Sequence, residues 1–178
     1  KTQGSGTSKS VEYRSRIDTY ARITAYEWTV TGPTRFLVET RSGLRMHYGS
    51  APNSRVALQS GTRAILFWLC DQAEDRSGNF MSFRYVEGEP LQAHLKQVTF
   101  TGKRNPSSGA LVSEPYASLE FEYDRLAQPY ELRYVNGEEI RARLRLRRIV
   151  SKFQKKEFRV YEPQYTLDPG VPGTFRLA

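Results

Sequence analysis

The chain has 178 residues, of which 38% are hydrophobic and 12% aromatic, and its formal net charge at pH 7 is +8. This length suffices for one ordinary hydrophobic core or for part of a larger one, and no run of about 20 apolar residues predicts a transmembrane helix. A single cysteine, Cys70, excludes an intrachain disulfide, and its apolar surroundings predict a buried small side chain. Because the chain begins with Lys1 rather than Met, we expect it to be a piece of a longer protein.

The first third of the chain predicts strands joined by turns. Residues 1–10 are rich in Gly, Ser and Thr and are expected to form a flexible leader. The β-branched and aromatic residues of 11–30 favour strands over a helix. Residues 36–40 and 44–48 then predict a hairpin about the turn Arg41-Ser42-Gly43.

The segment 67–85 is the most informative part of the sequence. It predicts two strands joined by a tight turn at residues 75–79, because apolar and aromatic residues occur on both sides of Asp-Arg-Ser-Gly-Asn. Gly78 and Asn79 are residue types that tolerate positive φ, and Asp75 is expected to hydrogen-bond the backbone near Gly78. On the second strand, one face carries the apolar-aromatic stripe Met81, Phe83 and Tyr85.

The second half continues the pattern of strands and turns. After a break at residues 88–90, residues 94–100 predict a strand and residues 101–115 a loop. Residues 125–139 are interpreted as a lobe or crossover, residues 140–151 and 156–165 as a final hairpin, and Asp168-Pro169-Gly170 as a turn in a terminal tail over 168–178. Between them the alternation is clearest, with Leu119, Phe121 and Tyr123 on one strand face and Glu120, Glu122 and Asp124 on the other. These signals together predict an all-β antiparallel meander of hairpins.

A basic stretch near the end of the chain suggests two interpretations. Its arginines alternate with smaller or apolar residues, which predicts four guanidinium groups on one face of one strand: Arg141, Arg143, Arg145 and Arg147. Such a row could follow a phosphate backbone, and this makes a polyanion- or nucleic-acid-binding domain one alternative. The other interpretation is an ordinary amphipathic strand whose arginines face solvent or pair with the acidic face of residues 120–124.

No catalytic constellation is recognisable in the sequence. His47 and His94 are the only histidines, and neither has a cysteine or histidine neighbour at metal-ligand spacing. The carboxylate pairs 74–75 and 138–139 are adjacent residues, which point to opposite faces of a strand and so form no catalytic dyad. We therefore expect a protein that is not an enzyme and that uses no cofactor or metal.

Several motifs, in order, resemble the SpvB/TcB-type proteins, which include the amino-terminal region of the Salmonella virulence plasmid protein SpvB and the insecticidal toxin-complex B component, relatives of the Rhs/YD-repeat shells. The segment with Trp68-Leu69, residues 74–79 and Phe83-Arg84-Tyr85 resembles the family's strand-turn-strand unit. The other matching segments are Tyr13-Arg14-Ser15 with residues 36–44, residues 119–124, residues 144–149, and residues 158–161 with Tyr165. The resemblance extends over residues 11–167.

This resemblance implies a segment of a larger Rhs-like β-shell that encapsulates or presents a toxic effector domain. The implied partners are the remainder of the same shell-forming chain, the toxic effector polypeptide and the injection component of a toxin complex, and the implied location is a secreted or exported bacterial toxin. We expect Gly43, Asp75, Gly78 and Asn79 to set turns, and Trp68, Phe83, Tyr85, Phe121 and Tyr123 to carry packing. A stand-alone β-sandwich that binds a glycan or a protein is a further alternative.

Overall fold

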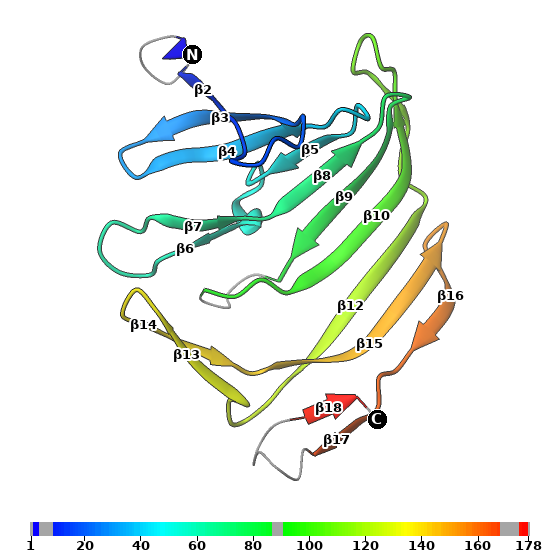
Figure 1. The fold of residues 1–178 in the computed structure, drawn as a ribbon. Helices are drawn as coiled ribbons and strands as arrows, with labels where there is room; N and C mark the ends of the chain where they lie inside the picture. The colour runs from blue at the N-terminus through cyan, green and yellow to red at the C-terminus, as the bar shows by residue number, and fades with distance from the viewer. Residues whose placement is uncertain (1, 4–8, 87–90, 168–174, 178) are drawn as a thin grey trace.

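The structure, a computed structural model, describes residues 2–3, 9–86, 91–167 and 175–177. Strands dominate these residues, and the one helix among them is the short 3-10 helix η1 (Pro52–Ser54) (Figure 1). The strands are β1 (Thr2–Gln3), β2 (Ser10–Tyr13), β3 (Arg22–Thr29), β4 (Gly32–Glu39), β5 (Arg45–Tyr48), β6 (Arg55–Ala57), β7 (Ile65–Trp68), β8 (Cys70–Glu74), β9 (Asn79–Tyr85), β10 (Leu95–Arg104), β11 (Leu111–Ser113), β12 (Ala117–Arg125), β13 (Glu131–Val135), β14 (Glu138–Ala142), β15 (Leu144–Phe153), β16 (Lys156–Tyr161), β17 (Tyr165–Leu167) and β18 (Phe175–Leu177).

One large antiparallel sheet organises the chain. Its strand order is β1-β2-β3-β4-β5-β8-β9-β10-β12-β15-β16, and β11 adds to the side of β10, so the sheet has 12 strands. Neighbours in the sheet are mostly neighbours in the sequence, and the strand pairs among the described residues are antiparallel. The predicted all-β meander is thereby confirmed. Three hairpins, β6–β7, β13–β14 and β17–β18, form separate two-stranded sheets.

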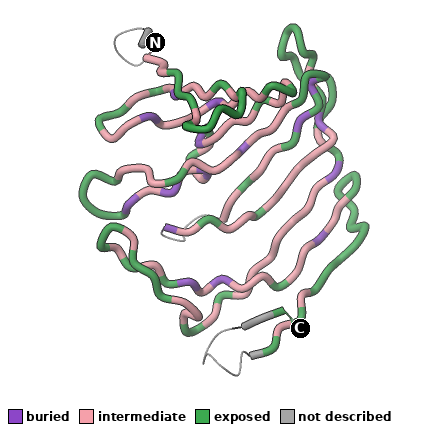
Figure 2. The backbone as a smooth tube through the Cα atoms, viewed as in Figure 1, coloured by how far each residue is buried: buried purple, intermediate pink, exposed green. Residues whose placement is uncertain are grey.

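The main sheet is a single curved layer (Figure 1). In the described part of the chain no second large sheet lies on either of its faces, and the one helix is the three-residue η1. Fully buried residues are therefore few and scattered along the strands, and most residues of the sheet are half-buried (Figure 2). A compact apolar cluster among the described residues joins hairpin β6–β7 to residues farther along the chain. Its buried members are Val56, Leu58 and Leu91, and Ile140 of β14 packs against them.

A carboxylate strengthens this contact between the two hairpins. Glu138 at the start of β14 accepts hydrogen bonds from the backbone N–H groups of Gln59 and Ser60, both at 2.8 Å, and from the Ser60 hydroxyl at 2.5 Å. These bonds hold the pKa of Glu138 below its ordinary value. Apolar and polar contacts thus join hairpins β6–β7 and β13–β14, and the hydrogen-bonded residues Gln59 and Glu138 are 79 positions apart in the sequence.

Several predicted elements were wrong in detail. The strand expected from residue 67 is broken at Leu69, because β7 pairs with β6 whereas β8 pairs with β9. The expected loop over 101–115 is shorter, since β10 continues to Arg104 and β11 pairs with its end. The expected lobe over 125–139 contains strand β13, which forms a hairpin with β14. Its turn is Asn136-Gly137, where both residues have positive φ, as a two-residue hairpin turn requires.

The chain ends also differ from the predicted boundaries. Strand β1 pairs with β2, so part of the expected leader is a strand. Strand β17 pairs with β18 across the expected boundary at residue 168, so the tail contributes to a hairpin. The predicted break at 88–90 and the predicted turn Asp168-Pro169-Gly170 lie outside the described residues.

Candidate functional site: the two faces of the sheet

One face of the main sheet is apolar over most of its width. Residues directly opposite each other on antiparallel strands share a face, so the register assigns each side chain to one side. We call this side the apolar face, and it carries Val11, Ile23, Ala25, Phe36, Val38, Met46, Tyr48, Ala73, Met81, Phe83, Val98, Phe100, Leu119, Phe121 and Ile149. The stripe predicted on β9 is therefore one part of a much wider surface.

The apolar face is incompletely covered. Met81 is 40% exposed and Tyr13, which packs against Phe36 with ring centroids 6.2 Å apart, is 42% exposed. Its larger aromatic and aliphatic residues are half-buried rather than buried. A continuous apolar surface of this extent on a single sheet marks a place where other polypeptide packs.

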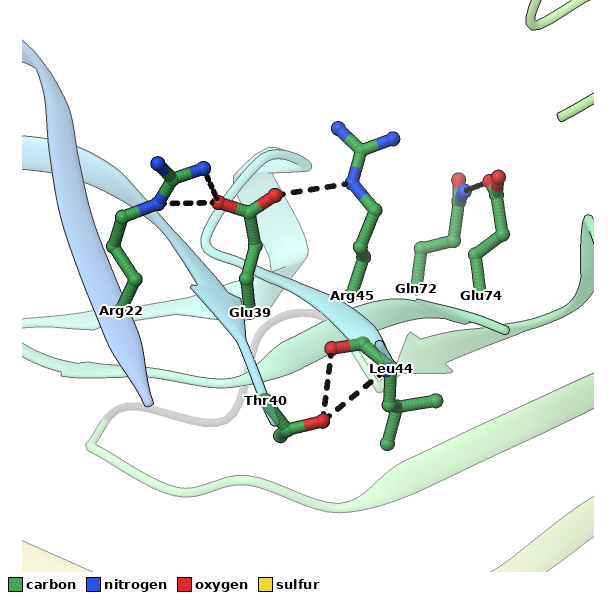
Figure 3. A network of polar contacts seen from close by, with 7 residues as sticks. All are labelled: Arg22, Glu39, Thr40, Leu44, Arg45, Gln72 and Glu74. Carbon is green, nitrogen blue, oxygen red and sulfur yellow. Dashed lines mark hydrogen bonds and ion pairs between the residues drawn. The ribbon is translucent and has the colours of Figure 1, made fainter. Parts of the chain in front are cut away.

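The opposite side, which we call the polar face, carries charged and amide side chains. At one end Glu39 of β4 accepts hydrogen bonds from Arg22 of β3 and also pairs with Arg45 of β5 at 3.7 Å (Figure 3). Next to them Gln72 and Glu74 of β8 point the same way (Figure 3). The face continues over β9, β10, β12 and β15 with Ser82, Arg84, Gln97, Thr99, Ser118, Glu120, Glu122, Arg148 and Lys152.

Three buried apolar side chains of the main sheet lie beneath the polar face. Leu37 is 8% exposed, Phe80 7% and Val150 1%, and the register places all three on that face. A long charged side chain covers Phe80, since the guanidinium carbon of Arg104 lies 4.7 Å from the centre of the Phe80 ring. The polar face thus covers buried side chains with its own long side chains, whereas no further layer covers the apolar face among the described residues.

The five side chains expected to carry packing are all half-buried. Trp68 packs edge-on against Phe36, with ring centroids 4.9 Å apart, and its indole N–H donates to the carbonyl of Pro33 at 3.2 Å. The hydroxyls of Tyr85 and Tyr123 donate to the carbonyls of Cys70 and Leu95, at 2.7 and 2.8 Å. The other two, Phe83 and Phe121, lie on the apolar face. The sequence did not indicate that Phe80 and Val150 would be the more buried residues.

The predicted turn at residues 75–79 is organised by one carboxylate. Asp75 accepts hydrogen bonds from the backbone N–H groups of Ser77 and Asn79, at 2.8 and 2.9 Å, and from the Asn79 side chain at 2.8 Å. The bonds from Asn79 are the main reason why the pKa of Asp75 lies below its ordinary value. Gly78 has φ of +80°, as expected, whereas Asn79 is the first residue of β9 and is not among the residues with positive φ. Asn79 serves as a hydrogen-bond partner, so the expectation of positive φ there was wrong.

The two turns with the sequence Arg-Ser-Gly lie side by side. Arg76 donates to the carbonyl of Arg41 at 2.8 Å, and its side chain crosses Gly43, which has φ of +84°. A Cβ atom at position 43 would lie 1.9 Å from Nε of Arg76. The repeated turn chemistry thus produces a direct contact between neighbouring hairpins of the sheet.

The four arginines predicted on one strand are divided between elements. Arg141 belongs to β14, where Glu139 of the same strand pairs with it, and Arg143 lies between β14 and β15. Arg145 and Arg147 belong to β15 and pair with Asp124 at 3.3 Å and Glu122 at 2.5 Å. The expectation of one row on one strand was wrong, because the strand is interrupted at Arg143. Pairing with the acidic strand, the alternative interpretation, is confirmed for Arg145 and Arg147.

A cleft of about 1000 Å³ opens over the polar face between η1 and β12. His47, Gln72, Arg84, Lys96 and Gln97 are among the residues that line it. Burial is the main cause that lowers the pKa of His47, with the nearby charge of Arg45 as the next cause. The neutral imidazole therefore predominates at pH 7, and a neutral imidazole has one nitrogen that can donate a hydrogen bond and one that can accept.

The cleft's carboxylates already have partners. Asp71 accepts from the backbone N–H of Ala51 and from the hydroxyl of Ser54, both at 2.8 Å. Glu120 pairs with Lys152 at 2.6 Å, and Glu122 pairs with two arginines of β15, Arg147 at 2.5 Å and Arg148 at 3.7 Å.

The remaining candidate residues are the second histidine, His94, and the single cysteine, Cys70. Within the described ranges no three His, Cys, Asp or Glu side chains are grouped so that they could hold a metal ion. His94 packs against Tyr123, with ring centroids 5.5 Å apart, far along the chain from His47. Cys70 is half-buried rather than fully buried, and burial raises the pKa of its thiol. A search of the described residues for a helix long and apolar enough to cross a membrane found none.

Comparison with known proteins identifies a family and a set of similar folds. The family model of the Salmonella virulence plasmid 65kDa B protein, SpvB, matches residues 2–118. No curated protein sequence matches the chain. The solved N-terminal domain of effector protein SpvB from Salmonella typhimurium strain LT2 has a TM-score of 0.74 at 14% identity, and the match covers 96% of this chain and 67% of that one.

Two further structures have the same fold within much longer chains. TcdB2-TccC3-Cdc42 gives a TM-score of 0.69 at 17% identity, covering 93% of this chain and 11% of that one. TcdB2-TccC3 without its hypervariable C-terminal region gives a TM-score of 0.70 at 17% identity, with the same two coverages, 93% and 11%. This chain therefore spans about two thirds of the SpvB domain and about a tenth of the TcdB2-TccC3 chains.

Proposed function

The chain belongs to the SpvB family, and we propose that it is a non-catalytic wall segment of a bacterial toxin-complex shell that encloses or presents a toxic effector domain. In this proposal its partners are the remainder of the shell-forming chain, the effector polypeptide and the injection component of the complex. The assembled protein is exported or secreted by the bacterium. The segment itself carries out no reaction.

The observation that carries this proposal is the contrast between the two faces of a one-layer sheet. An independent domain buries its apolar surface between two layers. Here the apolar face has no covering layer among the described residues, while the polar face covers its own buried side chains. A wall segment accounts for this asymmetry, because its apolar face is covered when the rest of the shell is present.

The last strand of the main sheet supports the same function. All six residues of β16 are exposed, including Phe158 at 72% and Val160 at 41%. This strand ends the sheet, so the side away from β15 has no paired strand in the described part of the chain. An apolar edge of this kind favours pairing with a further strand. In a shell, the next hairpin of the wall would supply that strand.

The experiment that tests this function compares the 178-residue chain with the longer natural protein that contains it by hydroxyl-radical footprinting. We expect Met81, Phe83 and Phe121 on the apolar face to be oxidised in the shorter chain and protected in the longer one. Tyr134 of hairpin β13–β14, which is 69% exposed, serves as the internal reference. Equal oxidation of the apolar face in both proteins would contradict the proposal.

A matched pair of substitutions gives an independent readout. Met81→Lys places a charge on the apolar face, and Leu132→Lys places one on β13, where the side chain is 56% exposed. Because both positions are substantially exposed in the shorter chain, neither change should unfold it. In the longer protein Met81→Lys should lower the melting temperature more than Leu132→Lys, since the charge would be buried. Equal effects in the longer protein would count against a covered apolar face.

A further inference from the structure

We propose that the cleft on the polar face binds an extended acidic peptide segment. The site is separate from the apolar face, and binding there does not require the rest of the shell. It stands on three features of the cleft: two cations that form no ion pair with a described carboxylate, a backbone irregularity that places one of them, and a lining rich in amide groups.

The cations are Arg84 of β9 and Lys96 of β10, both exposed. No ion pair joins either one to another described residue, whereas Glu120 and Glu122 in the same cleft are paired with cations of β15. The carboxylate of Asp71 is 8% exposed and is occupied by its bonds to Ala51 and Ser54. The cleft therefore presents positive charge to a ligand, although it contains as many as three carboxylates.

A β-bulge places Lys96 in the cleft. The register of β9 and β10 passes from Tyr85↔Leu95 directly to Arg84↔Gln97, so Lys96 has no residue opposite it. Bulges of this kind redirect a side chain out of the regular alternation, and they are frequent near functional sites. Arg84 is opposite Gln97, so the two cations and one amide lie around the same irregularity.

The lining matches a peptide better than a sugar or a nucleic acid. The amide side chains of Asn53, Gln72 and Gln97 both donate and accept, as the backbone of an extended peptide does. Arginine binds a carboxylate through two parallel hydrogen bonds. Bases and sugar rings are commonly held by aromatic stacking, but the register directs the side chains of Phe83 and Phe121 to the opposite face. A volume of about 1000 Å³ lies at the upper end of typical small-ligand clefts.

The test is fluorescence anisotropy with a labelled short peptide in which Glu alternates with Ser. The comparison ligands are the same peptide with Lys or Gln in place of Glu, an oligonucleotide and an acidic oligosaccharide. We expect the 178-residue chain to bind the Glu peptide in preference to all four. The double variant Arg84→Gln/Lys96→Gln should weaken that binding about tenfold.

The matched control is Arg16→Gln/Lys156→Gln, which removes the same charges from exposed positions outside the cleft. This control should change the dissociation constant of the Glu peptide by no more than about twofold, which is the general effect of lowering the net charge. Circular dichroism melts establish that each variant is folded. The proposal is overturned if the Glu peptide does not bind, if both double variants weaken binding equally, or if the oligonucleotide or oligosaccharide is preferred.

Discussion

The substitution Gly78→Ala tests whether the turn at residues 75–79 is fixed by its contact with β10. Gly78 has φ of +80°, and a Cβ atom there would lie 2.0 Å from the carbonyl oxygen of Arg104. The obstacle is backbone rather than a flexible side chain, so the turn and β10 must separate. The hydrogen bond from the Arg104 N–H to the Gly78 carbonyl, 2.8 Å long, would be lost in that movement.

Two contributions give the expected magnitude. An alanine in the left-handed region costs about 1–2 kcal/mol, and the lost backbone hydrogen bond adds about 0.5–1.5 kcal/mol. The free energy of unfolding should therefore fall by about 1.5–3.5 kcal/mol. For a chain of this size that corresponds to a decrease of roughly 3–14 °C in the melting temperature.

Gly137→Ala is the matched control. Gly137 has φ of +82°, but a Cβ atom there would have no neighbour within 4 Å. It should lose only the conformational part, about 1–2 kcal/mol. Urea unfolding of both variants, followed by circular dichroism, measures the difference. Equal destabilisation by the two substitutions would refute the argument that contact with Arg104 fixes the turn.

Three further predictions concern hydrogen-bonded or buried groups. Glu138→Gln should speed amide hydrogen exchange at residues 59–60, whereas Glu139→Gln should leave it unchanged; the same rate in both variants would contradict the role of Glu138 in joining the hairpins. Because the folded-state pKa of Asp75 is lowered, its stabilising effect is present above the unfolded pKa of about 4 and is lost as the pH falls through the folded value. Acid unfolding should show this, and Asp75→Asn should shallow the pH dependence there; an unchanged profile would disprove it. Burial raises the pKa of Tyr85 to about 12, and it also raises the pKa values of Tyr48, Tyr123 and Tyr130. Ultraviolet titration should therefore show late-titrating phenols, and Tyr85→Phe should remove the one near pH 12; an unchanged titration curve would contradict this assignment.

The general fold could be predicted from the sequence because it depends on local signals. Turn residues at 41–43 and 75–79 and period-2 alternation at 119–124 specify hairpins directly. Consecutive hairpins that pair with their neighbours then form the observed sheet. The motif resemblance indicated the SpvB family, and the match of the family model to residues 2–118 confirms that family.

The errors arose where one continuous strand-like sequence changes partners. Residues 65–74 contain no turn signal, yet the chain leaves β6 at Leu69 and joins the main sheet as β8. Likewise, nothing in the alternating sequence near Arg143 indicates that pairing passes from β13 to β12. Such a change depends on pairing between distant segments, and local patterns do not determine it.

The cleft could not be predicted from the sequence either, because it too depends on contacts between distant segments. Its lining comes from five strands and η1, and Lys96 enters it through a bulge between β9 and β10. The burial of Val150 could not be predicted either, because it shares its strand face with Arg148 and Lys152, a pattern typical of a solvent-exposed face.

The most direct test of the central claim is solution mass and shape, measured by light scattering coupled to small-angle X-ray scattering on the 178-residue chain and on the longer natural protein. The wall-segment account predicts that the shorter chain self-associates through its apolar face and its β16 edge, and that the longer protein is a monomer with a hollow scattering profile. A shorter chain that is a monodisperse, fully folded monomer, together with a longer protein that has no hollow interior, would contradict it.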